Sequence, residues 1–108
     1  MKLIIAIVNK DDSATVISKL NKAGFMCTKL STTGGFLRAG NTTLLIGTDE
    51  KKVDDVLDVL RKYCSRRTEM INAAAGGFSE QFISSVPVEI AVGGATVFVV
   101  DVDKFIKM

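Results

Sequence analysis

The chain has 108 residues, of which 47% are hydrophobic, and its 14 basic residues are scattered among 12 acidic ones. This length predicts a single domain, and a net charge of +2 argues against a surface dedicated to duplex nucleic acid. The absence of histidine removes the commonest general base and the commonest transition-metal ligand, which argues against most hydrolases and metalloenzymes.

Neither a membrane span nor a secretion signal is predicted. No apolar run approaches the roughly 20 residues that a membrane helix needs. The apolar N-terminus lacks a small-residue cleavage site before the polar residues 9–12. We therefore expect a cytoplasmic protein with no membrane partner.

The first half of the chain predicts three strands and one helix. Residues 3–8 form a continuous apolar run of strand length. A helix follows, with N-cap candidates at residues 11–13 and an end at Gly24. Residues 25–33 predict a second strand, whose even-numbered side chains point one way and whose odd-numbered side chains point the other. Residues 42–47 predict a third strand.

A second helix is predicted to begin near Thr48 or Asp49 and to carry Arg61 and Lys62 in its last turn, where cations complement the macrodipole. Its apolar positions follow the spacing of a core-facing helix. They are Val53, Val56, Leu57, Leu60 and Cys64. Cys64 and the distant Cys27 form neither a CxxC pair nor a disulfide framework, so we expect both to be reduced packing residues.

The last third of the chain is predicted to be a long connection followed by two strands. Residues 65–86 show little periodicity and form a 22-residue connection, which in a compact domain is usually functional or mobile. Residues 88–92 and 95–102 predict the last strands, which we expect to meet at a tight turn or bulge at residues 93–94. Residues 103–108 predict a short terminal turn.

This order of elements predicts an α+β fold for residues 1–108. Two β-α-β halves indicate a ferredoxin-like sandwich with an antiparallel sheet and two helices on one face. The other face of the sheet needs a cover, and a mean hydropathy of +0.30 is high for a small monomer. We therefore expect subunits to pack sheet faces or edges against one another.

A glycine-rich run at residues 32–43 lies between the second and third predicted strands. Its three glycines can bring backbone N–H groups close to a phosphate. Phe36 offers a stacking face, Arg38 a forked cation and Asn41 an amide that can pair with an adenine edge. The run is therefore suited to a planar, anionic ligand, and the alternative interpretation is a flexible hairpin tip.

Two common nucleotide motifs and a catalytic site are not supported. In the near match to a P-loop, Asn41 stands where the lysine would be, and a strand rather than a helix follows. The glycine pairs at residues 76–77 and 93–94 do not continue into a dinucleotide fingerprint. No nucleophile stands in a recognisable elbow or beside a plausible base, so we expect no enzyme and no catalytic or metal-binding residue.

Two segments resemble a known family. Residues 28–43, TKLSTTGGFLRAGNTT, and residues 92–99, VGGATVFV, are similar to the PII-like cyclic di-AMP receptors of Gram-positive bacteria. The similarity covers essentially the whole chain. It implies a homotrimer of PII-like, ferredoxin-like subunits that binds cyclic di-AMP in clefts between neighbours. It also implies a short loop after the second strand and a long loop before the fourth.

The resemblance implies eight ligand contacts at positions that match the family. Phe36 or Phe98 would flank a purine, while Thr28 and Asn41 would hydrogen-bond adenine or sugar. Leu37 would pack on a base from the neighbouring subunit. The glycines would offer backbone N–H groups. The full set is Thr28, Gly35, Phe36, Leu37, Asn41, Gly47, Gly93 and Phe98.

Each of these residues also has a purely structural interpretation. Gly47 would relieve crowding at a strand-to-helix turn, Phe98 would be a core residue, and Thr28 an ordinary strand residue. Two further positions depart from the family pattern, since Met26 stands in place of a basic residue and Lys107 in place of an uncharged polar one. If those side chains touch the ligand, the affinity will differ from that of relatives.

The resulting hypothesis is a second-messenger sensor for signal transduction. Ligand binding would order the loop at residues 34–41 and shift the loop at residues 65–86, which changes the surface shown to an unknown protein partner. Two alternatives remain. A classical PII-type regulator would bind ATP or ADP and 2-oxoglutarate, but the cations that face the triphosphate are not evident around residues 34–41. A structural interaction module would use these glycines only as turns.

Overall fold

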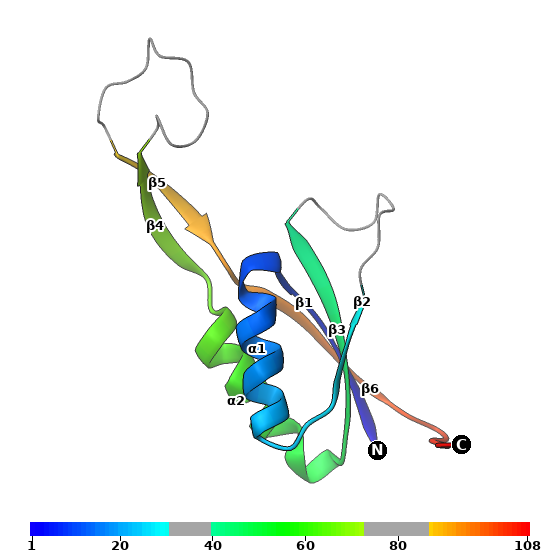
Figure 1. Ribbon diagram of the computed structural model, residues 1–108. Coiled ribbons are helices and arrows are strands. Elements are labelled where there is room, and N and C mark those ends of the chain that lie inside the picture. Colours follow the sequence, from blue (N-terminus) through cyan, green and yellow to red (C-terminus); the bar gives the residue numbers. More distant parts are fainter. Residues whose placement is uncertain (31–39, 73–86) are drawn as a thin grey trace.

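The computed structural model describes residues 1–30, 40–72 and 87–108, which form six strands, two α-helices and a 3₁₀ turn (Figure 1). In chain order these are β1 (Lys2–Asn9), α1 (Lys10–Lys22), β2 (Cys27–Leu30), β3 (Asn41–Thr48), η1 (Glu50–Lys52), α2 (Val53–Cys64), β4 (Arg67–Asn72), β5 (Pro87–Val92) and β6 (Ala95–Asp101).

Four of the strands form one antiparallel sheet in the order β2-β3-β1-β6. The continuous apolar run of β1 lies at the centre, where a strand has neighbours on both sides. Helices α1 and α2 lie side by side on one face of this sheet (Figure 1). The expected α+β class is therefore confirmed, and the arrangement is consistent with a small ferredoxin-like fold.

The core lies between the sheet and the two helices. Even-numbered residues of β1 and β3 point toward the helices, and all of them except Lys2 at the start of β1 are buried, as the period-2 alternation of a strand requires. Cys64 is part of this core and Cys27 packs against it, as predicted. The buried apolar residues are Ile4, Ala6, Val8, Val16, Leu20, Phe25, Leu44, Ile46, Val56, Leu60 and Cys64.

Helix α1 begins earlier than expected. Its N-cap is Asn9, whose side-chain oxygen accepts a hydrogen bond from the Asp11 backbone N–H at 2.8 Å, so the prediction of a cap at residues 11–13 was wrong. The acids at positions 11 and 12 instead lie in the first turn, where they favour the positive end of the helix dipole. The helix ends before Gly24, which has a φ of 90°.

The second strand and the second helix differ from expectation at their ends. Strand β2 covers Cys27–Leu30 rather than residues 25–33, and residues 31–33 lie outside the described part of the chain. Helix α2 begins at Val53, because residues 50–52 form a 3₁₀ turn before it. Residues 103–108 form no helix or strand.

The main correction concerns residues 65–92. The predicted long connection contains β4, which pairs antiparallel with β5 in a separate two-stranded sheet that we call the arm. The arm projects beyond the four-stranded sheet (Figure 1). Of the tight turn or bulge predicted between residues 88–92 and 95–102, the tight turn is wrong, since β5 pairs with β4 and β6 pairs with β1 rather than with each other. Residues 93–94 are instead the joint through which the chain passes from the arm to the main sheet.

Candidate functional site

The sheet face opposite the helices has no covering element among the described residues, and we call it the open sheet face. It carries the odd-numbered residues of β1 and β3 and the even-numbered residues of β2 and β6. Thr28 pairs with Leu45, Leu45 with Ile5, and Ile5 with Phe98, so these four residues form one row across the sheet. Thr28 is exposed and Phe98 is 52% exposed, so the interpretation of Phe98 as a core residue is wrong for the single chain.

Two further predicted contacts lie on the same face at opposite ends of β3. Gly47 pairs with Leu3 at one end, and Asn41 pairs with Asn9 at the other. Six residues separate Gly47 from Asn41, which at about 3.4 Å per residue places them about 20 Å apart. The structure thus brings four predicted positions onto one face but divides them between its two ends.

A cavity of about 700 Å³ lies at the Gly47 end of the open sheet face, and we call it the Thr28 cavity. Thr28 and Gly47 both line it. Met26 and Lys107, the two positions that depart from the family pattern, line it as well. The Thr28 cavity therefore gathers four positions that the sequence singled out from three separate segments.

Other residues of the Thr28 cavity were missed by sequence reasoning. Phe105 and Ile106 follow β6 and are 64% and 58% exposed, which is unusual for large apolar side chains. Lys52, in the turn η1, adds a second cation beside Lys107. Phe105 and Ile106 could have been identified in the sequence as a pair of bulky apolar residues within the charged residues 103–108.

A second cavity, of about 470 Å³, lies at the Asn41 end, and we call it the Asn41 cavity. It brings together two predicted contacts, Asn41 and Gly93, from β3 and from the joint between the arm and β6. Arg66 and Thr96 also line it. Arg66 was not predicted as a site residue.

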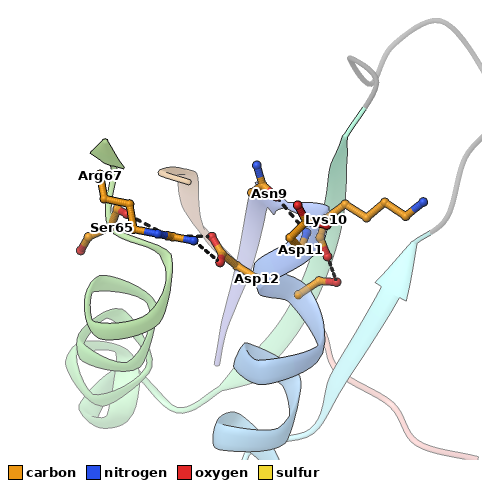
Figure 2. A network of polar contacts seen from close by, with 7 residues as sticks. Asn9, Lys10, Asp11, Asp12, Ser65 and Arg67 are labelled. Atoms are coloured by element: carbon orange, nitrogen blue, oxygen red, sulfur yellow. Dashed lines mark hydrogen bonds and ion pairs between the residues drawn. The ribbon is translucent and has the colours of Figure 1, made fainter. Parts of the chain in front are cut away.

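Gly93 has a structural role that the sequence did not reveal. Its φ is 78°, and a Cβ there would lie 2.5 Å from Nη1 of Arg67 and 2.9 Å from the carbonyl oxygen of Ser65. The Arg67 guanidinium donates hydrogen bonds to the Asp12 carboxylate, from Nη2 to Oδ1 at 2.9 Å and from Nη1 to Oδ2 at 3.3 Å (Figure 2). The Gly93 backbone thus lies directly against the ion pair between the arm and α1, with no room for a side chain.

The position of Gly47, unlike that of Gly93, has room for a side chain. A Cβ at this position would meet nothing within 4 Å, and its φ is not positive. The interpretation that Gly47 relieves crowding at the strand-to-helix turn is therefore wrong for the single chain. Glycine weakens a strand, and no contact in the described chain accounts for its presence at this position.

The remaining predicted contacts, Gly35, Phe36 and Leu37, lie outside the described residues. The described chain resumes at Gly40, whose carbonyl oxygen accepts a hydrogen bond from the Lys10 backbone N–H at 2.5 Å. This bond ties the start of β3 to the first turn of α1.

In residues 1–30, 40–72 and 87–108 we find no group of three His, Cys, Asp or Glu side chains able to hold a metal ion. Burial raises the pKa of the Cys64 thiol to about 11 and also raises the pKa of Cys27, which keeps both thiols protonated. Within the same ranges no helix has the length and apolar character needed to span a bilayer.

Comparison with known proteins relates the whole chain to one protein family and nearly all of it to a solved structure. The model of a family described as "Cyclic-di-AMP receptor" matches residues 1–108. A crystal structure of a protein from Pediococcus pentosaceus ATCC 25745, described as functionally unknown, superposes with a TM-score of 0.80 at 38% sequence identity. That match covers 99% of this chain and 96% of the other.

Proposed function

Because the chain belongs to the cyclic-di-AMP receptor family, we propose that it is a non-enzymatic cytoplasmic receptor that binds this second messenger between the subunits of a homotrimer and relays binding to a protein partner. The observation that carries the proposal is the common placement of Thr28, Gly47 and Asn41 on one sheet face that no described element covers. Cyclic di-AMP has two adenines and two phosphodiesters, so its site needs apolar faces, base-edge partners and anion-binding groups.

Binding between subunits is supported by the division of the site. Gly47 and Asn41 lie about 20 Å apart on a nearly straight strand, at the two ends of the open sheet face. A compact ligand that uses both sets of residues takes one set from each of two neighbouring chains. In the proposal, the Thr28 cavity of one subunit therefore faces the Asn41 end of the next.

The absence of a side chain at Gly47 also supports binding between subunits. Its hydrogen side chain leaves the backbone open toward the Thr28 cavity, although nothing in the chain itself requires that space. A ligand or a neighbouring subunit that approaches the backbone closely explains the glycine. Thr28 and Lys107, which line the same cavity, supply a hydroxyl and a cation toward such a ligand.

A trimer is supported by the apolar character of the open sheet face. Ile5, Leu45 and Phe98 form a continuous apolar row there, and Phe98 and Val100 are 52% and 41% exposed. An uncovered apolar sheet face of this kind is typical of a protein interface. Packing three such faces around an axis buries the row and brings the ends of neighbouring sheets together.

Relay to a partner is supported by the first turn of α1 (Figure 2). Its Lys10 N–H donates to the Gly40 carbonyl next to Asn41, and its Asp12 accepts from Arg67 at the base of the arm. One helical turn therefore contacts both the start of β3, where the proposed ligand-binding loop ends, and the arm. A ligand shifts the arm only if its affinity differs between the protein conformations that have the arm in its two positions.

Isothermal titration calorimetry with cyclic di-AMP tests the proposal. We expect saturable binding with one ligand per chain, which is three sites per trimer. Light scattering is expected to give a particle mass of three times the 11.6 kDa of one chain. Asn41→Ala is expected to weaken binding by more than 1 kcal/mol. The matched control is Asn21→Ala, since Asn21 is exposed on α1 on the opposite side of the sheet.

Three results would contradict the proposal in different ways. No heat and no thermal stabilisation at millimolar cyclic di-AMP would exclude the ligand. Displacement of the ligand by ATP with 2-oxoglutarate at lower concentrations would indicate a classical PII-type regulator. Conversion of cyclic di-AMP during incubation, followed by chromatography, would indicate an enzyme.

A further inference from the structure

Arg66 and Arg67 are adjacent in the sequence at the base of the arm, but their side chains have different surroundings. Arg67 donates to the Asp12 carboxylate, whose side chain is only 10% exposed. Arg66 is exposed and forms no ion pair with any residue in the described part of the chain. Its positive charge is therefore uncompensated there.

The backbone of this segment holds Arg66 against the wall of the Asn41 cavity. The Gly94 N–H donates to the Cys64 carbonyl at 2.6 Å, which fixes the joint beside residue 66. A Cβ at Gly94 would lie 3.6 Å from the Arg66 Cβ, an ordinary van der Waals distance, so Gly94 and the base of the Arg66 side chain are direct neighbours. The base of the Arg66 side chain is thus seated at a defined point rather than on a free loop.

Arg66 borders two cavities, and their linings differ in charge. The cavity on the helix side is also lined by Arg61 and by the apolar residues Leu57 and Val97. There the Arg66 guanidinium would meet a like charge and few hydrogen-bond partners. In the Asn41 cavity, Arg66 is the one charged residue among the described residues that line it. Arg66 is therefore the source of positive charge, among the described residues, in the cavity that Asn41 also lines.

We propose that Arg66 binds a phosphodiester of a cyclic dinucleotide in the Asn41 cavity. This inference rests on the proposed function and names its anion-binding residue. The planar guanidinium can donate two parallel N–H bonds to the two free oxygens of one phosphodiester, a geometry that lysine cannot reproduce. Asn41 in the same cavity then meets the edge of the attached adenine.

The test compares three variants with the wild-type protein by calorimetry with cyclic di-AMP. Arg66→Gln is expected to weaken affinity by about 10- to 100-fold, as loss of a hydrogen bond to a charged group does. Arg66→Lys keeps the charge without the fork and is expected to fall between Arg66→Gln and the wild type. Arg61→Gln, the matched control with the same charge change outside the Asn41 cavity, is expected to bind as the wild type does.

The salt dependence of binding is a second measurement, made on the wild-type protein and on Arg66→Gln. An ion pair between Arg66 and a phosphodiester is screened by salt, so the dissociation constant is expected to rise between 50 and 500 mM NaCl, and to rise less in Arg66→Gln. Wild-type binding that is insensitive to salt, or equal affinities in Arg66→Gln and Arg61→Gln, would overturn the role of Arg66 alone. Absence of wild-type binding would overturn the proposed function instead.

Discussion

Arg67 and Asp12 form an ion pair across 55 positions of sequence and join the arm to the first turn of α1. The Asp12 side chain is 10% exposed and the Arg67 side chain 44% exposed. Water therefore screens the pair from one side only, and the Asp12 end lies in a largely desolvated setting. Nearby, the Gly94 N–H donates to the Cys64 carbonyl and so links the joint at residues 93–94 to the end of α2.

Asp12→Asn is expected to destabilise the junction between the arm and α1. The amide keeps the shape of the side chain but removes the carboxylate charge that accepts from the Arg67 guanidinium, which costs about 1–3 kcal/mol. Urea unfolding measures the loss, and hydrogen exchange is expected to quicken at β4 and β5. Asp58→Asn is the control, because the exposed Asp58–Arg61 pair contributes about 0–1 kcal/mol. Equal effects of the two changes would contradict a special role for Asp12.

Alanine substitutions at glycines are expected to separate steric from conformational requirements. Gly93→Ala adds a Cβ that collides with Nη1 of Arg67 at a φ of 78°, and is expected to destabilise by roughly 1–3 kcal/mol. Gly24→Ala has a similarly positive φ but open space, so it carries the backbone strain alone and is expected to cost less. Thermal unfolding ranks the two, and the reverse order would contradict the collision.

Gly47→Ala is expected to leave the free energy of unfolding of the ligand-free chain unchanged or slightly raised. Alanine suits a strand better than glycine does, and its Cβ meets nothing within 4 Å. The same change is expected to weaken binding of cyclic di-AMP, because the methyl group enters the Thr28 cavity. Calorimetry and urea unfolding of the same sample make the comparison. Unchanged affinity would remove Gly47 from the site.

Phe98→Asp is expected to dissociate the proposed trimer. Phe98 is 52% exposed at the edge strand of the open sheet face, so a buried subunit contact there would place an unpaired carboxylate in an apolar setting. Light scattering is expected to report the mass of one chain instead of three. Asn21→Asp introduces the same charge on the opposite side of the sheet and is expected to leave the mass unchanged. A trimeric Phe98→Asp would place the subunit contact elsewhere.

Alkaline pH is expected to weaken the fold through Cys64. Burial raises the pKa of this thiol from 9.0 to about 11, so the unfolded chain loses the proton at a lower pH than the folded chain does. The contribution is fully present below pH 9 and is lost as the pH rises toward 11, because deprotonation then favours the unfolded state. Cys64→Ala is expected to show a shallower fall in unfolding free energy over this range. Identical slopes of unfolding free energy against pH in Cys64→Ala and the wild type would contradict the assignment of this effect to Cys64.

Much of the main sheet and its helices could be predicted from the sequence because their faces differ in polarity. The apolar run of β1 and the 3.6-residue stripe of α2 each indicate an element that buries one side. Strand β4 lacks this signal: its Met70 is 63% exposed, since a two-stranded arm has no interior to bury apolar residues in. Strand β5 has the composition of a sheet strand, but composition does not reveal its partner.

The candidate site was predictable in part for a related reason. Alternation along β2 and β3 is enough to place Thr28, Asn41 and Gly47 on a common face once the register is known. The role of Gly93 depends on Arg67 and Asp12, which meet only in the folded chain. Arg66 was overlooked because its distinguishing feature is the ion pair of its neighbour, not any pattern of its own.

The separate pairing of the arm has a consequence for how such a receptor can diversify. Strands β4 and β5 hydrogen-bond to each other and to no strand of the main sheet. Residue pairs added to or removed from both strands together leave the register of β1, β3 and β6 untouched. The arm can therefore change in length and sequence without altering how the strands of the main sheet pair.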